Sequence, residues 1–186
     1  MDDGLFKGKY RIASCRLPYQ NYEVGCFFVT ICTKDMVHYF GRIVDGKMLL
    51  TPVGKAADDL IAAMPQRYER VEVIAHVVMP NHVHLMLRIH ARMRCDDRAT
   101  TPVATDTPAK NEQMQTIATN VGELSKVINH YKGNVTKYAK ANGISFAWQS
   151  GFYDEIVRDD AAYNAVKCYI ENNVIRWKNL FYPSKK

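Results

Sequence analysis

The stretch from residue 79 to residue 90 limits the possible folds of this chain more than any other. It begins Met-Pro-Asn-His-Val-His and then alternates, with Val, Leu, Leu and Ile at positions 83, 85, 87 and 89. Successive side chains of a strand point to opposite faces, so this alternation predicts a strand that buries one face in a core. His82 and His84 would then lie next to each other on the opposite face.

Two neutral imidazoles held side by side on a buried strand are suitable ligands for a divalent cation. A His-x-His strand also occurs in proteins that bind no metal, where both histidines have structural roles. From His82 and His84 alone, a metal site and a structural pair both stay open.

Length and composition are those of one soluble globular domain. The chain has 186 residues, of which 47% are hydrophobic and 24% charged, enough to build one full core. We therefore expect a single domain over residues 1–186. No apolar run approaches the roughly 20 residues of a membrane span, so no membrane association is expected. The five cysteines are odd in number and lack Cys-x-x-Cys spacing, which favours reduced thiols in a cytoplasm.

Basic residues outnumber acidic ones, 25 to 19, which leaves a net charge of +6. An excess of this kind is compatible with a polyanionic partner such as nucleic acid, because lysine and arginine displace counterions from phosphates. Many globular proteins have the same balance, so the charge alone does not establish such a partner.

Periodicity and turn residues predict an alternation of strands and helices. The expected elements are strands at 22–33, 37–44 and 47–50, a helix at 52–64, strands at 71–78 and 82–89, a helix at 122–141, an extended segment at 145–157 and a last helix of about 16 residues from 159 or 160. We expect the first three strands to be antiparallel, with a tight turn at Asp45-Gly46. The strands at 71–78 and 82–89 should pair as a hairpin. Thr51 can cap the helix at 52–64, and Pro52 suits its first position. This order predicts an α+β fold with a central antiparallel sheet and helices mainly on one face, of the ferredoxin-like kind.

Residues 91–118 interrupt this pattern with a polar excursion. Thr, Ala, Pro, Asp, Asn and Gln dominate there, without any periodicity. A plain insertion, a lid over a site and a partner-binding segment all stay open.

The helix expected at 122–141 has one apolar face and several lysines on its other faces. These lysines are Lys126, Lys132, Lys137 and Lys140. They are candidates for contacts with a DNA backbone, although a basic helix face is also commonly just solvated.

The last helix places Tyr169 and Asn173 four residues apart, so both side chains lie on one face. A tyrosine on such a helix often has only a packing role. The sequence around it, Tyr-Ile-Glu-Asn-Asn, gains significance only in combination with the histidine stretch.

Residues 79–85 and 169–173 together resemble the two signatures of the single-tyrosine HUH transposases. This family includes the transposases of single-strand insertion sequences and the REP-associated tyrosine transposases. The resemblance extends over residues 8–178. Further matching positions are 28–33, 40–41, 78–80, Lys132 with Thr136, 148–149, 152–154 and 157–158.

The resemblance implies an HUH domain, which has an antiparallel sheet related to RNA-recognition folds, acting as a homodimer in the bacterial cytoplasm or nucleoid. Tyr169 would be the nucleophile that attacks a phosphate of single-stranded or hairpin DNA. The products would be a 5′-phosphotyrosine link and a free 3′-hydroxyl. His82, His84 and Asn173 would bind the divalent cation, Mg²⁺ or Mn²⁺.

Two positions depart from the family pattern. Val174 stands where REP-associated relatives usually have proline, and Asn173 is a weaker metal ligand than a carboxylate.

Other functions were weighed on the same residues. A non-catalytic DNA-binding protein derived from such a transposase is the main alternative. A nucleotide hydrolase of the histidine-triad class would need histidine at residue 86, which is Met86. A two-histidine phosphoesterase would need His-x-Thr or His-x-Ser twice, and the chain has neither.

Overall fold

A computed structural model describes residues 24–91 and 122–181 of the chain, with side chains as far as Trp177. Of the polar excursion at 91–118, all but the first residue lies outside the described residues, so its role stays a prediction. None of the helices in the described ranges is long and apolar enough to cross a lipid bilayer.

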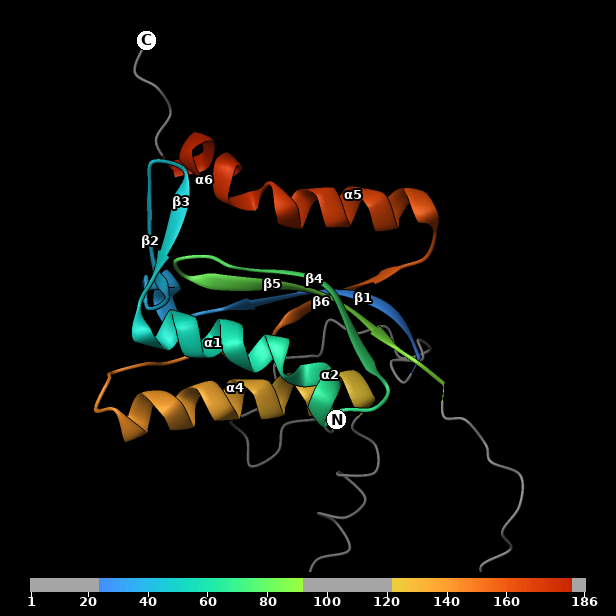
Figure 1. The fold of residues 1–186 in the computed structure, drawn as a ribbon, viewed down its shortest axis with the longest axis horizontal. Helices are drawn as coiled ribbons and strands as arrows, with labels where there is room; N and C mark the ends of the chain where they lie inside the picture. Colours follow the sequence, from blue (N-terminus) through green and yellow to red (C-terminus); the bar gives the residue numbers. More distant parts are fainter. Residues whose placement is uncertain (1–23, 92–121, 182–186) are drawn as a thin grey trace, which may run out of the picture.

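A four-stranded antiparallel sheet forms the centre of the fold (Figure 1). Its strands are β1 (Gly25–Cys32), β4 (Val71–Val78), β5 (His82–Ile89) and β6 (Tyr153–Val157). They lie in the order β4-β5-β1-β6, and each neighbouring pair is antiparallel. The predicted α+β class with a central antiparallel sheet is therefore confirmed, as is the predicted hairpin of the histidine strand, β5, with β4.

The hairpin of β2 (Gly41–Val44) and β3 (Lys47–Leu50) is a separate two-stranded sheet. Its Asp-Gly turn has the expected positive φ at Asp45 (49°) and Gly46 (74°). We expected the first three strands to be antiparallel, but β1 does not pair with this hairpin and pairs with β5 and β6 instead. After β1, Asp35 and Met36 both have positive φ in a short 3-10 helix (Lys34–Met36), and the chain turns away from the sheet there.

Three helices cover one face of the sheet: α1 (Pro52–Ala62), α2 (Met64–Arg67) and α4 (Glu123–Ala141). As predicted, α1 begins with a cap, because the Thr51 hydroxyl accepts a hydrogen bond from the amide of Gly54 at 3.1 Å. Gly54 packs directly on the backbone of Phe40, where a Cβ would lie 2.1 Å from the carbonyl oxygen. Only glycine fits this approach.

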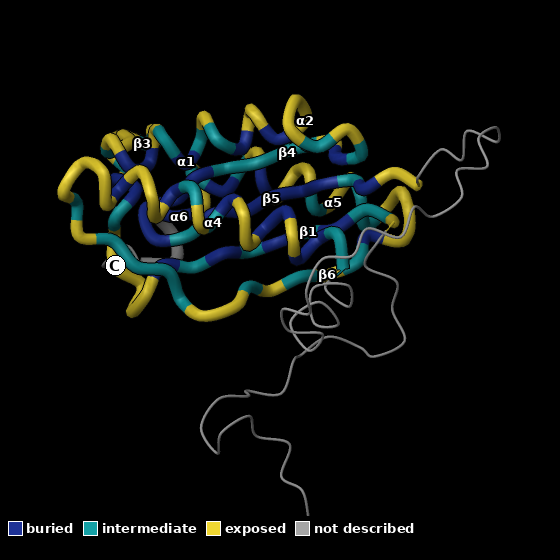
Figure 2. The backbone as a smooth tube through the Cα atoms, turned by 90° about the horizontal axis from the view of Figure 1, so that it is seen from below, coloured by how far each residue is buried: buried dark blue, intermediate teal, exposed yellow. Residues whose placement is uncertain are grey.

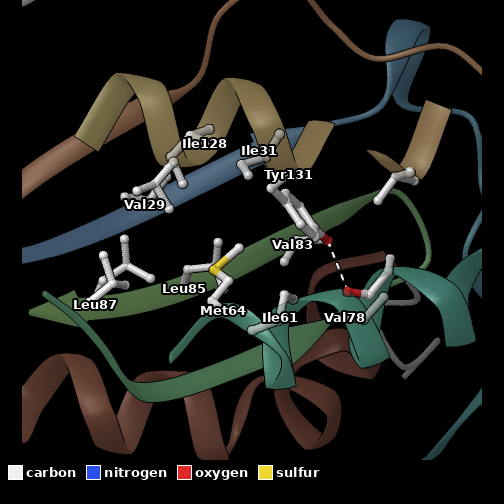
Figure 3. Close-up of a cluster of buried hydrophobic side chains, with 14 of the residues drawn as sticks. Val29, Ile31, Ile61, Met64, Val78, Val83, Leu85, Leu87, Ile128 and Tyr131 are labelled. Carbon is white, nitrogen blue, oxygen red and sulfur yellow. Dashed lines mark hydrogen bonds between the residues drawn. The ribbon is translucent and has the colours of Figure 1, made fainter. Parts of the chain in front are cut away.

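The main core fills the space between these helices and the sheet (Figure 3). Strands β1 and β5 contribute their odd-numbered side chains, among them Val29, Ile31, Val83, Leu85 and Leu87. Ile61, Ile128 and Tyr131 meet them from the helices. The Tyr131 hydroxyl is buried with its ring and donates to the carbonyl of Ala57 at 3.3 Å. Figure 2 shows the same layering, with buried strands and helices whose outer sides are exposed.

The opposite face of the sheet is covered by α5 (Asp160–Glu171), followed by α6 (Asn173–Phe181) (Figure 1). Asp159 caps α5 by accepting from the amide of Ala162 at 2.7 Å. The single last helix that we predicted is thus divided at Asn172, where φ is −96° and ψ is 4°. The helices lie mainly on one face, as predicted, and α5 with its tyrosine lies on the other.

A second, smaller core joins α5 to the sheet. Met86, Val157 and Ile170 are buried in it, with Phe28 and Val166 packed beside them. The even-numbered side chains of β5 face this side, because the odd-numbered ones are in the main core. The two histidines therefore belong to the α5 face.

Candidate functional site

His82 and His84 lie side by side on the α5 face of β5. Their ring centroids are 4.6 Å apart. In the register of the sheet, His82 is opposite Cys32 of β1, and His84 is opposite Thr30. The side-by-side placement that the alternation predicted is present in the structure.

The His82 ring is oriented by its neighbour in the chain, Asn81. The Asn81 amide nitrogen donates to the carbonyl of Met36 at 3.2 Å, which directs the amide oxygen to the imidazole. That oxygen lies 2.8 Å from His82 Nδ1. Because an amide oxygen can only accept, the proton of His82 lies on Nδ1, and Nε2 keeps its lone pair.

The His84 ring is held from two sides. Thr30 Oγ1 lies 2.9 Å from His84 Nδ1, and the Phe28 ring stacks on the imidazole with centroids 5.2 Å apart. Both residues belong to β1, the strand that pairs with β5 through its whole length. His84 Nε2 therefore points away from β1 towards α5.

Burial keeps both imidazoles neutral. It lowers the pKa of His82 from its usual 6.5 to about 4. The pKa of His84 falls to about 3, through burial first and then through the neighbouring His82. At neutral pH both side chains are uncharged, which is the form that binds metal ions.

Tyr169 of α5 meets this histidine pair from the opposite side. Its hydroxyl lies 3.4 Å from His84 Nε2, and the two ring centroids are 5.3 Å apart. The edge of the phenol ring also contacts Phe28, with centroids 6.0 Å apart. Tyr169 is 36% exposed, so solvent or a ligand can reach it. Two residues separated by 85 positions in the sequence thus share one site.

Asn173 lies between two residues that touch the histidines. Tyr169 contacts His84, and Trp177 packs on His82 with ring centroids 5.7 Å apart. Asn173 is four residues from each of them and is only 6% exposed. Its side chain makes no hydrogen bond with either imidazole. The role of Asn173 as a metal ligand therefore stays a prediction.

The four lysines predicted to contact DNA are not part of this site. They lie on α4, across the sheet from Tyr169 (Figure 1). The exposed ones are Lys126, Lys137 and Lys140.

Lys132 is half-buried and tied to the loop before β6. Its ammonium donates to the carbonyls of Gln149 at 2.9 Å and Gly151 at 2.6 Å. It also lies 5.8 Å from the centre of the Trp148 ring. Burial lowers its pKa. These contacts give Lys132 a role in holding that loop.

Sequence reasoning assigned no role to Asn81, Thr30, Phe28 or Trp177. The first three lie within or beside stretches that match the family, yet their contacts become visible only when the strands are paired. Trp177 had a signal in the sequence, because it continues the row of Tyr169 and Asn173 at a spacing of four residues.

The donors present limit how a cation could be bound. Within the described ranges, no group of three or more His, Cys, Asp or Glu residues is placed to hold a metal ion. Two imidazole nitrogens are the protein donors that lie together, and the amide of Asn173 stays a predicted third. A bound ion would take its remaining ligands from water or from a substrate.

Comparison with known proteins adds three findings. No family model matches the chain. A protein of Haemophilus influenzae, itself described as uncharacterized, is 31% identical over 176 residues, which cover 92% of each chain. The solved structure of a REP-associated tyrosine transposase bound to a REP hairpin matches 89% of this chain and 74% of its own, with a TM-score of 0.54 and 17% identity. The chain therefore belongs to one family with the Haemophilus influenzae protein, and it shares the fold of the REP-associated tyrosine transposase.

Proposed function

We propose that this protein is a metal-dependent single-stranded DNA transposase, in which Tyr169 is the nucleophile. One observation supports this proposal above all others. The hydroxyl of Tyr169, on a helix near the end of the chain, lies 3.4 Å from a nitrogen of the buried histidine pair. A packing tyrosine has no need of such a partner, whereas a nucleophile must lie beside the group that neutralises the phosphate.

The reaction follows from the chemistry of a phenol. The Tyr169 oxygen attacks the phosphorus of a phosphodiester, and the bond from phosphorus to the 3′ oxygen breaks. The phenol loses its proton, and the departing 3′ oxygen gains one, so the step is balanced. The products are a 5′-phosphotyrosine link and a free 3′-hydroxyl. Because the link keeps the phosphodiester energy, a second 3′-hydroxyl can reverse the step and join a new strand.

His84 is a poor base for this reaction despite its position. Its pKa of about 3 means that it does not hold a proton near neutral pH. We therefore propose that the phenol of Tyr169 releases its proton to water and not to His84. The two histidines are better suited to act as ligands.

The residues present fit a divalent cation. His82 and His84 have their Nδ1 atoms engaged by Asn81 and Thr30, so Nε2 is the nitrogen of each ring that would bind a metal. At His84 the metal would replace the contact of Nε2 with the Tyr169 hydroxyl, 3.4 Å away. Asn173 would complete the protein donors, with DNA and water oxygens beyond them. When bound, Mn²⁺ or Mg²⁺ would neutralise charge on the phosphate, and the nitrogen donors favour Mn²⁺ of the two.

The DNA partner is proposed on similar grounds. The solved structure with this fold is bound to a REP hairpin, and the present chain has a net charge of +6. We propose single-stranded or hairpin DNA as the substrate. A single tyrosine holds one strand end at a time, so joining two ends requires two copies of the chain, which we propose act as a homodimer.

The test is a covalent adduct. Labelled single-stranded oligonucleotides of random sequence, with and without a hairpin, are incubated with the protein and Mn²⁺ or Mg²⁺. We expect a protein–DNA band that survives denaturing electrophoresis, and Tyr169→Phe should remove it while DNA binding persists.

Tyr163→Phe is a matched control, because Tyr163 lies on the same helix and packs in the small core. Its adduct should equal that of the parent. DNA binding without any adduct in either metal would instead favour a non-catalytic DNA-binding protein.

A further inference from the structure

The sheet face that holds the histidines is only partly covered by α5. This helix packs against β4 and β5. At the far edge of the same face, on β6, Tyr153 is 57% exposed, and Glu155 is also exposed. Exposure alone says little, because single apolar side chains are common on protein surfaces. The position of Tyr153 on the sheet is more informative.

Tyr153 lies in the same row across the sheet as His84. Thr30 of β1 is paired with His84 on one side and with Tyr153 on the other. Directly opposite residues of antiparallel strands point to the same face, and the Thr30 hydroxyl does contact His84. Tyr153 is therefore two strand spacings, roughly 10 Å, from the histidine at the backbone level.

The phenol end of Tyr153 is held in place by Gln149. The side-chain amide of Gln149 donates to the Tyr153 hydroxyl at 3.3 Å. The backbone of Gln149 is also held in place. Its backbone N–H donates to the carbonyl of Cys32 at 2.9 Å, and its backbone carbonyl accepts from the Lys132 ammonium at 2.9 Å. No ring among the described residues stacks on Tyr153. A positioned, exposed ring on which no described ring stacks is suited to stack on a flat ligand.

We propose that Tyr153 stacks on an unpaired DNA base close to the phosphate that Tyr169 attacks. This proposal rests on the proposed function, because it takes single-stranded DNA as the ligand. Proteins that bind single strands combine a basic surface with exposed aromatic rings on which bases stack. A distance of roughly 10 Å corresponds to about three stacked nucleotides, or fewer in an extended strand.

Glu155 indicates which part of the strand faces this edge. Its carboxylate lies on the same face, two residues beyond Tyr153, opposite Phe28. A negative charge there disfavours a phosphate and leaves an uncharged base as the compatible contact. The DNA backbone must then pass on the side of the histidines, with a base directed to Tyr153.

Stacking is tested with two probes of equal charge. One is an oligo(dT) strand of about 20 nucleotides, and the other is an abasic deoxyribose-phosphate strand of the same length. Binding of both is measured by fluorescence anisotropy for the parent and for Tyr153→Ala, Tyr153→Leu and Tyr153→Phe. The side chain is 57% exposed, so we expect each variant to fold, and a thermal unfolding curve checks it.

We expect Tyr153→Ala and Tyr153→Leu to lose about 5- to 150-fold in affinity for oligo(dT), with little change for the abasic strand. Tyr153→Phe keeps the ring and should bind like the parent. Tyr138→Ala removes a 37%-exposed tyrosine from α4, across the sheet, and should have no effect.

The two proposals fail in different ways. Equal binding of oligo(dT) by the parent, Tyr153→Ala and Tyr153→Leu would overturn the stacking proposal, whether or not the Tyr169 adduct forms. Base-dependent binding that requires Tyr153, in a protein that forms no adduct, would support stacking and refute the transposase reaction.

Discussion

The two faces of the central sheet differ in the residues that cover them. The face under α1 and α4 is covered by aliphatic side chains in a large continuous core (Figure 3). The face under α5 has a small core and, beside it, the buried His84, the half-buried His82, a tyrosine and an open edge. One face holds most of the buried apolar residues, and the other holds the residues of the proposed site. A sheet with one well-packed face can accommodate polar groups on the other.

Polar burial on the α5 face is matched by hydrogen bonds. His84 is 5% exposed and Asn81 is 1% exposed. Each has a partner, Thr30 for His84 and the Met36 carbonyl for Asn81. Without them, each unpaired group would cost about 1–3 kcal/mol. The cost of placing these groups inside the protein is therefore small in this structure.

The largest expected effect compares two adjacent residues of β5. Leu85 and Met86 are both fully buried, but Leu85 belongs to the large core and Met86 to the small one. Leu85→Ala should lower the free energy of unfolding by about 3–5 kcal/mol, and Met86→Ala by about 2–3 kcal/mol. Urea denaturation measures both. Equal losses would mean that the two faces contribute alike.

The next effect is the response of the metal-free protein to acid. The folded pKa values of His82 (about 4) and His84 (about 3) lie below the usual 6.5. Between the folded and unfolded pKa values, the two histidines bind more protons in the unfolded chain than in the folded one. The free energy of unfolding should therefore fall as pH falls from 6.5 towards 4. The slope is at most about 1.4 kcal/mol per pH unit for each histidine.

Denaturation with a chelator present, at several pH values, measures this slope. Replacing both His82 and His84 with glutamine should flatten it within that window. A variant as acid-sensitive as the parent would show that the acid response has its origin elsewhere.

A smaller effect is expected from a substitution of Thr30, whose hydroxyl contacts His84 Nδ1. Thr30→Val keeps the shape of the side chain and removes the hydroxyl that orients the imidazole. Manganese affinity should fall by about 10-fold or more, because groups that orient metal-bound histidines have effects of this size. Isothermal titration with Mn²⁺ measures it.

Thr136→Val is the control for that change, since Thr136 is an exposed threonine of α4 whose hydroxyl donates to Lys132. Unchanged manganese affinity in Thr30→Val would separate Thr30 from the proposed ligand pair.

The smallest effect concerns the exposed lysines of α4. Alanine at Lys126, Lys137 or Lys140 should weaken binding of single-stranded DNA by about twofold at most, because screening limits their reach from the far face. The adduct rate at saturating DNA should not change. If each substitution instead lowered the slope of log affinity against log salt concentration by about one, the DNA would also contact the α4 face.

The local parts of the fold were predictable, and the long-range parts were not. Alternation at residues 82–89 correctly placed His82 and His84 together, and Thr51 and Pro52 marked the start of α1. The pairing of β1 with β5 and β6 depends on contacts far apart in the sequence, which no local pattern encodes. The break at Asn172 was missed because its residues are compatible with a continuous helix. Tyr169 was singled out through a family resemblance, since periodicity alone makes it a packing residue.

Strand β1 serves both faces at once, with Val29 and Ile31 in the large core and Phe28 and Thr30 against His84. A single inserted or deleted residue inside β1 would exchange these two sets of side chains. Substitutions at one position affect one face, whereas a change in length disrupts the core and the site together. Over evolutionary time we therefore expect length variation in this family to be confined to the connections between elements and excluded from this strand.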